Sequence, residues 1–151
     1  MLEDRLNQDL KRALLSRDAF TVSTLRGLKS AILYAKVAEG LPRDTAAPDA
    51  AVVAVLQKEA KKRQESAELY KQGGSEDKAA NELAEKAIVE RYLPAQLDEM
   101  QIGALIEEAI AEMGDVDQRA MGQIIATVRD KAAGSADGAL IARLVKERLQ
   151  K

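Results

Sequence analysis

The stretch DAAVVAVLQKEAKKRQESAELYKQGG, residues 49–74, decides how this chain folds. It has no proline, no glycine before Gly73, and many residues that favour the α-helix. Pro48 stands just before it, Asp49 is expected to cap its start, and Gly73 is expected to end it. A helix over residues 49–73 would be about 35 Å long, which is long enough to organise a small domain.

This predicted helix has an apolar face and a basic face. The residues predicted to face a core follow the helical spacing: Val53, Leu56, Ala60, Ala67 and Tyr70. Lys58, Lys61 and Lys62 gather elsewhere, with Arg63 at their edge. They either contact phosphates or belong to a solvated face held by ion pairs, and charge alone favours the second interpretation. The spacing allows three such pairs: Glu59–Arg63, Lys61–Glu65 and Glu68–Lys71.

The flanking sequence predicts three more helices in an N-terminal domain. The first covers Leu2–Arg17, and the second runs from between Thr21 and Thr24 to about Glu39. Residues 40–48 contain two prolines and predict a loop. Ser75 is expected to cap a fourth helix that ends near Tyr92, before Pro94. Its predicted inner face consists of Ala80, Leu83, Ala84, Ala87 and Ile88, with Arg91 at its end.

Pro94–Asp98 is the predicted domain boundary, followed by three shorter helices. The first is expected to start at Asp98 and to end at Met113, before Gly114. The second starts at Asp115 or Asp117 and ends near Gly134, and the third starts at Ser135 or Asp137. The sequence therefore predicts an all-α protein with a four-helix N-terminal domain, residues 1–93, and a small three-helix C-terminal domain, residues 94–151.

Composition excludes several classes of function. Apolar residues make up 46% of the chain but aromatic residues only 3%, so the core must consist of Leu, Ile, Val and Ala. Without histidine or cysteine there is no histidine acid–base catalysis, no cysteine nucleophile and no ordinary zinc site. Phosphate-binding glycine loops are also missing. Glu107, Glu108 and Glu112 are interpreted as exposed helix charges. We therefore expect no catalytic residues, no metal and no cofactor.

Charge and hydropathy also limit location and partners. The net charge is −2, so the chain is not a generally basic nucleic-acid binder and no DNA binding is expected. No uncharged stretch is long enough to cross a bilayer, and the N-terminus lacks the apolar run of a signal peptide. We expect a soluble, cytoplasmic protein without a membrane partner.

Glycines mark the C-terminal domain. Gly122 lies within the apolar stripe of its predicted helix, where glycine costs about 1 kcal/mol relative to alanine. Close approach of a neighbouring helix or of a ligand would explain it. Gly134 and Gly138 bracket Ser135, Ala136 and Asp137. This bracket is either a helix stop followed by a helix start, which turn chemistry favours, or a place where a ligand meets the backbone.

Several segments together resemble the YqeY family, also called GatB/YqeY-domain proteins. They are STLRGLKSAI (Ser23–Ile32), VLQKEAKKRQESAELYKQGG (Val55–Gly74), YLPAQL (Tyr92–Leu97) and MGQIIATVRDKAAGSADGALIARLVKERL (Met121–Leu149). The resemblance covers nearly the whole chain. No single segment is strongly specific for the family, but the combination of segments is. It implies that the C-terminal domain is similar to the tail of GatB, a subunit of the glutamine-dependent tRNA amidotransferase, where the tail is implicated in contacting tRNA.

The resemblance implies a non-catalytic tRNA-binding module. A label of carbon–nitrogen ligase activity with glutamine as amido-N-donor would be inherited from GatB, because this chain lacks the domains that perform that chemistry. Where the family often has a basic residue, this chain has Ser135. The candidate RNA-binding residues are Gly122, Arg129, Lys131, Gly134, Ser135, Asp137, Gly138 and Lys146, with Lys58, Lys61 and Lys62 as a second contact.

Among these residues Lys131 is the cation nearest the glycine turn by sequence, and N–H groups at the last helix start are available to a phosphate. The alternative function is a helical protein–protein adaptor that docks on an aminoacyl-tRNA synthetase or on amidotransferase components. Expected partners are therefore tRNA or these proteins.

Overall fold

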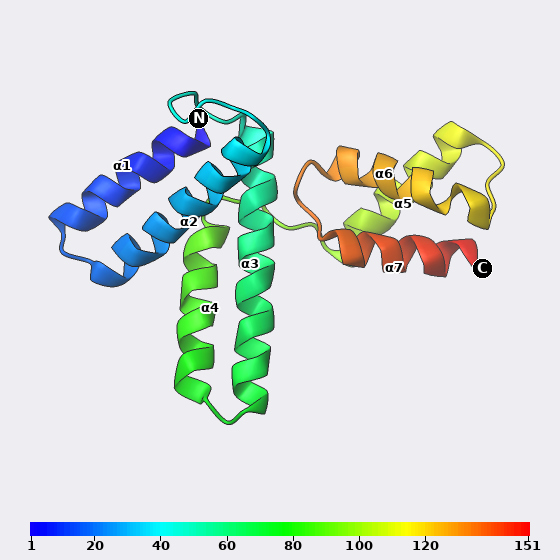
Figure 1. Cartoon of the computed structure of the whole chain (residues 1–151). Coiled ribbons are helices and arrows are strands. Elements are labelled where there is room, and N and C mark those ends of the chain that lie inside the picture. Colours follow the sequence, from blue (N-terminus) through cyan, green and yellow to red (C-terminus); the bar gives the residue numbers. More distant parts are fainter. The chain divides into compact units, whose positions relative to one another are not determined.

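The computed structural model describes residues 1–151, which form α-helices and no strand (Figure 1). The all-α prediction is confirmed. The chain divides into two compact units, Met1–Leu93 and Pro94–Lys151, which we call unit 1 and unit 2. Unit 1 contains α1 (Leu2–Leu15), α2 (Ala19–Ala38), α3 (Asp49–Gln72) and α4 (Glu76–Glu90). Unit 2 contains α5 (Glu99–Met113), a short 3-10 helix η1 (Gln118–Ala120), α6 (Met121–Ala132) and α7 (Gly138–Leu149). No helix is both long enough and apolar enough to span a membrane.

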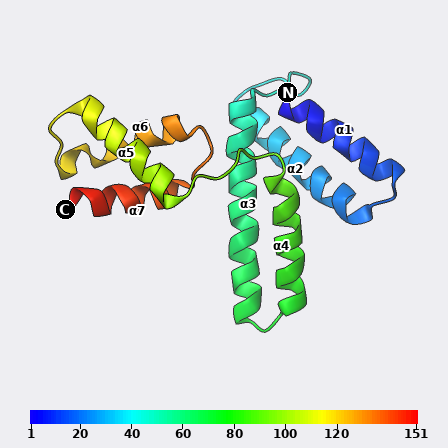
Figure 2. The same cartoon turned by 180° about the vertical axis from the view of Figure 1, so that it is seen from behind.

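Unit 1 consists of two helical hairpins. Helices α1 and α2 lie side by side and pack against one end of the longer hairpin of α3 and α4 (Figures 1 and 2). The core lies at this junction, and its largest fully buried side chains are Leu6, Leu25, Leu28, Val52, Leu56 and Val89. Farther along α3 and α4, the small residues Ala67 and Ala79 are buried outside that core. Alanine allows the two helices to approach closely where no third helix covers them.

Two helix starts in unit 1 differ from the sequence prediction. Helix α2 begins at Ala19, before Thr21, because Asp18 caps it by accepting from Thr21 N at 3.1 Å and from Thr21 Oγ1 at 2.6 Å. Asp49 does not cap α3, since Pro48 holds the cap position. Instead Asp49 Oδ1 accepts a hydrogen bond from Leu2 N at 2.9 Å. This carboxylate therefore connects the starts of α1 and α3.

The predicted inner faces of α3 and α4 are partly wrong. On α3 Val52 is fully buried while Val53 is half-buried and Tyr70 is exposed. On α4 the buried residues are Ala79, Ile88 and Val89, whereas three alanines predicted to face inward are exposed: Ala80, Ala84 and Ala87. Over much of their length these helices contact only each other, so the buried stripe is narrow. One residue of rotation, about 100°, then moves a side chain out of it.

Unit 2 is a three-helix bundle with its own core. Asp98 caps α5 as predicted and forms a capping box with Gln101, with N–O distances of 2.7 and 3.0 Å. Asp117 starts the 3-10 turn that precedes α6, its Oδ1 accepting from Arg119 N at 2.9 Å. The core residues at its centre come from all three helices: Ile102, Ile106, Ile124, Val128, Ile141 and Val145.

Candidate nucleic-acid interface

The connection between α6 and α7 brings five of the predicted site residues together: Arg129, Gly134, Ser135, Asp137 and Gly138. Ala133 and Gly134 both adopt left-handed backbone conformations, with φ of 49° and 86°. Ser135 fixes the turn through its backbone, because its N–H donates to Ala132 O at 2.9 Å and its carbonyl accepts from Leu97 N at 2.8 Å. The turn is therefore held to α6 and to the segment that precedes α5.

Helix α7 begins without a side-chain cap. Asp137 occupies the cap position, yet its carboxylate makes no capping hydrogen bond. Its backbone carbonyl accepts from Ile141 N at 3.1 Å, so only the ordinary helical bond is formed there. The first turn of a helix carries partial positive charge, and an uncapped start is suited to bind an anion.

Arg129 lies against this helix start. A Cβ placed on Gly138 would be 3.1 Å from Arg129 Nη2, so the guanidinium packs directly on the Gly138 backbone. Arg129 is exposed on the last turn of α6 and makes no ion pair. Sequence spacing had favoured Lys131 as the nearest cation. The signal that was missed is the absence of a side chain at Gly138, which makes room for the guanidinium.

Lys131 is engaged elsewhere. Its ammonium contacts Glu108 Oε1 at 3.0 Å and Glu112 Oε1 at 2.9 Å, joining α6 to α5. Hydrogen bonds that the ammonium donates to Glu112 and Glu108 raise the pKa of Lys131. A cation held by two carboxylates has little attraction left for a phosphate, so Lys131 is placed as a structural residue.

Two further cations of unit 2 are also held by glutamates, and others make no ion pair. Arg148 is bound to Glu107, and this hydrogen bond lowers the pKa of Glu107. Arg143 bridges Glu99 and Glu147 at 2.7 and 3.1 Å. Three cations make no ion pair: Arg129, Lys146 and Lys151.

Gly122 does not lie in the buried stripe of α6, where its position in the sequence suggested it. It is exposed, and a Cβ added to it would meet no atom within 4 Å. The predicted close approach of a neighbouring helix is therefore wrong. The helix turns its buried side toward Ile124 and Val128 instead.

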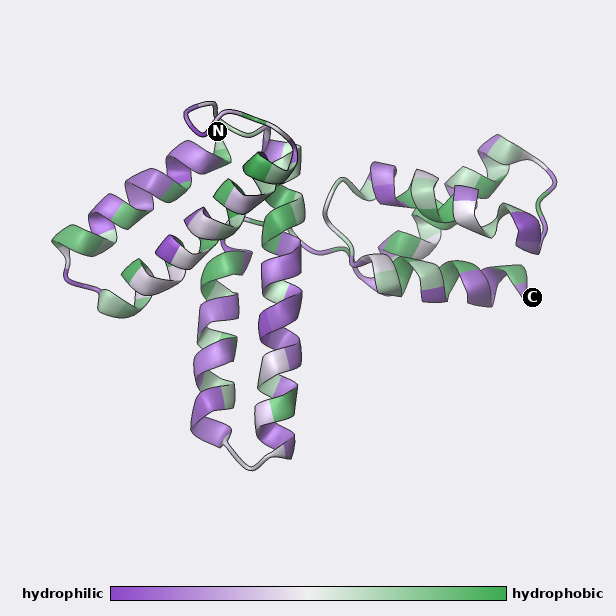
Figure 3. Ribbon diagram, in the orientation of Figure 1, coloured by the Kyte–Doolittle hydropathy of each residue, from purple (hydrophilic) through white to green (hydrophobic).

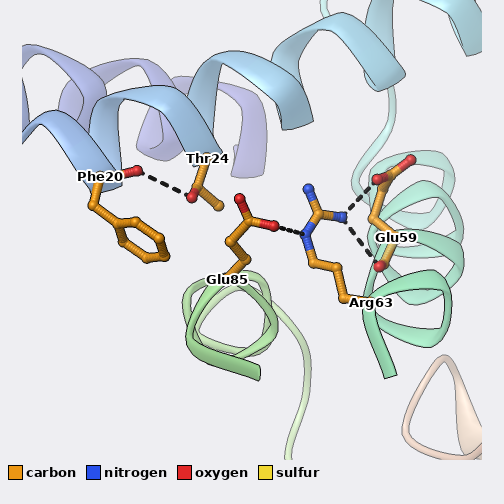
Figure 4. A network of polar contacts seen from close by, with 5 residues as sticks. All are labelled: Phe20, Thr24, Glu59, Arg63 and Glu85. Atoms are coloured by element: carbon orange, nitrogen blue, oxygen red, sulfur yellow. Dashed lines mark hydrogen bonds and ion pairs between the residues drawn. The ribbon is translucent and has the colours of Figure 1, made fainter. Parts of the chain in front are cut away.

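In unit 1 the basic strip on α3 is exposed and unpaired. Lys58, Lys61 and Lys62 make no ion pair, so the predicted Lys61–Glu65 pair is absent. Arg63 belongs to a different environment (Figure 4): its Nη1 donates to Glu59 Oε2 at 2.7 Å, and its Nε lies 3.4 Å from Glu85 Oε2 on α4. The predicted Glu59–Arg63 pair is confirmed. The Nε contact is ionic only, since that atom has no hydrogen-bond partner.

The protein is all-helical, and its short three-helix bundle carries an unpaired arginine beside the α6–α7 turn. The model of the family described as Yqey-like protein matches residues 3–149, and the chain belongs to this family. No curated protein matches the chain.

Proposed function

We propose that the protein is a non-catalytic, cytoplasmic tRNA-binding module in which the α6–α7 turn contacts the RNA backbone. The observation that carries the proposal is the position of Arg129, an unpaired guanidinium packed on Gly138 at the uncapped start of α7. A guanidinium and backbone N–H groups are both donors suited to a phosphate. Lys146 on α7 is a further unpaired cation in the same unit.

Shape and a few cations must supply the affinity. Unit 2 has seven basic and ten acidic residues, so general attraction to polyanions is weak. Folded RNA is recognised largely through its shape, its backbone and its 2′-hydroxyls, which suits such a surface. Lys58, Lys61 and Lys62 in unit 1 would add a second contact. The resemblance to the GatB tail supports the same partner, and we attribute any amide transfer to other proteins.

The first prediction tests this turn. Arg129→Ala should weaken tRNA binding and reduce the slope of log affinity against log salt by about one, because one phosphate contact is lost. The wild-type slope should correspond to roughly 2 to 4 phosphates. Fluorescence anisotropy with labelled tRNA over a salt series measures both.

Lys131→Ala is the matched control, since it removes a cation that the structure pairs with two glutamates. It should leave the slope unchanged at temperatures where the variant remains folded. If Arg129→Ala behaves like the wild type, or if Lys131→Ala alone changes the slope, the turn is not the RNA contact.

A second candidate function is a protein–protein adaptor for a synthetase or an amidotransferase. The observation that favours it is a set of exposed apolar side chains in unit 1, among them Leu15 at 85% and Tyr34 at 78% exposure. Pull-down from lysate with and without ribonuclease separates the two functions. Partners bridged by RNA are lost after ribonuclease treatment, while directly bound proteins remain.

A further inference from the structure

Two hollows lie along the α1–α2 hairpin, one at each end, and we call them together the outer groove. The first, about 470 Å³, is lined by the end of α1 and the start of α2: Leu14, Arg17, Ala19, Val22, Ser23 and Arg26. The second, about 560 Å³, lies at the opposite end of the hairpin and includes Glu3, Asn7, Lys29, Ser30, Leu33 and Arg43. The α2 residues that line the two hollows follow one another at helical spacing, so they lie on one face of α2.

The groove has apolar anchors at both ends. Leu14 lines the first hollow and is 47% exposed, and Leu33 lines the second and is 36% exposed. Small residues, Ser23 and Ser30, lie between them on α2. In Figure 3 α2 shows less hydrophilic colour than α3 or α4. Exposed leucines beside small residues form a surface into which the apolar face of another helix fits.

The charges along the groove are mostly positive and unpaired. Helix α2 has no acidic residue over its 20 residues. Arg17, Arg26, Lys29 and Arg43 are exposed and make no ion pair, whereas the unpaired acids of the lining are Asp4 and Asp44. Glu3 is bound to the buried Lys36. The hollow between Leu14 and Ser23 is bordered by two arginines and by no acidic side chain.

One polar group in the groove lacks a partner. Asn7 lines the second hollow, and its buried Oδ1 makes no hydrogen bond. This oxygen is covered by the protein itself, so an occupant would reach it only after the Asn7 side chain turned toward the hollow.

From these features we infer that the outer groove binds an amphipathic helix of a partner protein, with acidic residues flanking its apolar face. The leucines and the hollows receive the apolar side chains, and Arg17, Arg26 and Lys29 pair with the acids. A second copy of this chain is a poor occupant, because pairing α2 with α2 would bring the same cations together. Asp4 and Asp44 disfavour RNA at one end. This inference does not depend on tRNA binding by unit 2.

Selection from a phage-displayed library of 16-residue peptides identifies what the groove binds. The full chain serves as bait, and each round is depleted on the Arg26→Glu/Lys29→Glu double variant. Enriched peptides should carry net negative charge and apolar residues at positions i, i+3, i+4 and i+7. Enrichment of basic peptides, or no enrichment beyond that on the double variant, would overturn the inference.

Binding of the leading synthetic peptide then tests the residues. By anisotropy the Arg26→Glu/Lys29→Glu variant should bind at least about tenfold more weakly than the wild type. The control variant Lys11→Glu/Lys71→Glu makes the same change in charge at exposed positions outside the groove, and it should stay within about twofold. Equal losses in both variants would mean that net charge, not the groove, determines binding.

Two other occupants give distinct results. If sedimentation shows a wild-type dimer that Arg26→Glu/Lys29→Glu dissociates, the occupant is a second copy and the inference fails. If no peptide is enriched but this variant loses tRNA affinity as Arg129→Ala does, the groove is an RNA surface, and the inference fails while the proposed tRNA binding stands.

Discussion

Tyr92 ties the end of α4 to α1 through its hydroxyl and its ring. The hydroxyl donates to Asp9 Oδ2 at 2.5 Å, and the Arg5 guanidinium lies over the ring at 4.8 Å. Arg5 also donates to the Arg91 carbonyl at 3.0 Å. Burial and the Asp9 carboxylate raise the pKa of Tyr92 well above its ordinary value. The sequence suggested only that Tyr92 lay near a helix end.

This raised pKa makes unit 1 sensitive to alkali. A folded-state pKa above the unfolded one gives stability that is complete below about pH 10 and is lost as pH rises further. Tyr92→Phe should therefore lower the free energy of unfolding by about 1–2 kcal/mol at pH 7, through loss of the hydrogen bond to a charged acceptor. The deficit should shrink above pH 10. Urea unfolding across pH measures this, with Tyr34→Phe as the exposed control, and a constant deficit would contradict it.

At the scale of single residues, the sequence predicts contacts between close neighbours in the chain better than contacts between helices. Asp98 was predictable as a cap because its partner, Gln101, is three residues away. Lys131 was not predictable as a structural cation because Glu108 and Glu112 lie about 20 positions earlier in the chain. Gly122 was predicted to lie in the apolar stripe of its helix but is exposed, because a glycine has no side chain to indicate which side of a helix faces the core. Local contacts can be read from spacing, whereas contacts between helices depend on packing.

Two helix starts in unit 2 offer a matched comparison at the scale of elements. Asp98 makes a full capping box at α5, whereas the Asp137 side chain makes no capping bond at α7. Asp98→Ala should lower the free energy of unfolding by about 1 kcal/mol, and Asp137→Ala should cost clearly less. Thermal unfolding of both variants tests this. Equal losses would show that the Asp137 carboxylate caps α7 in solution.

The helices themselves were largely predictable, and their orientations were less so. Prolines and glycines fixed the bounds of α3 and α5 to within a residue or two. The faces of α3 and α4 were harder, because an alanine-rich helix fits a core on more than one side. Ala80, Ala84 and Ala87 repeat at helical spacing and yet are exposed, whereas the buried Ala79, Ile88 and Val89 form no regular stripe, so only the neighbouring helices decide which side chains are covered.

For the whole molecule, the division of the core predicts separate folding. The apolar core of unit 2 is built entirely from residues after Pro94. A fragment of residues 94–151 should fold alone, with helical circular dichroism and a cooperative urea transition. Its stability should be low, because a domain of this size buries only about 60% of its unfolded surface. The complementary fragment 1–93 is the control, and a 94–151 fragment without cooperative unfolding would contradict the prediction.

The glutamates of α5 have a consequence for how strongly unit 2 attracts polyanions. They form ion pairs with Lys131, Arg143 and Arg148, so these three positive charges are neutralised within the bundle. In the proposed complex with tRNA, losing these acids would raise the affinity without any new basic residue. Glu108→Gln with Glu112→Gln frees Lys131 at the end of α6, two residues from Arg129, and should steepen the salt dependence of tRNA binding by about one unit. In this bundle the acidic residues would set the strength of an interaction that the basic residues make.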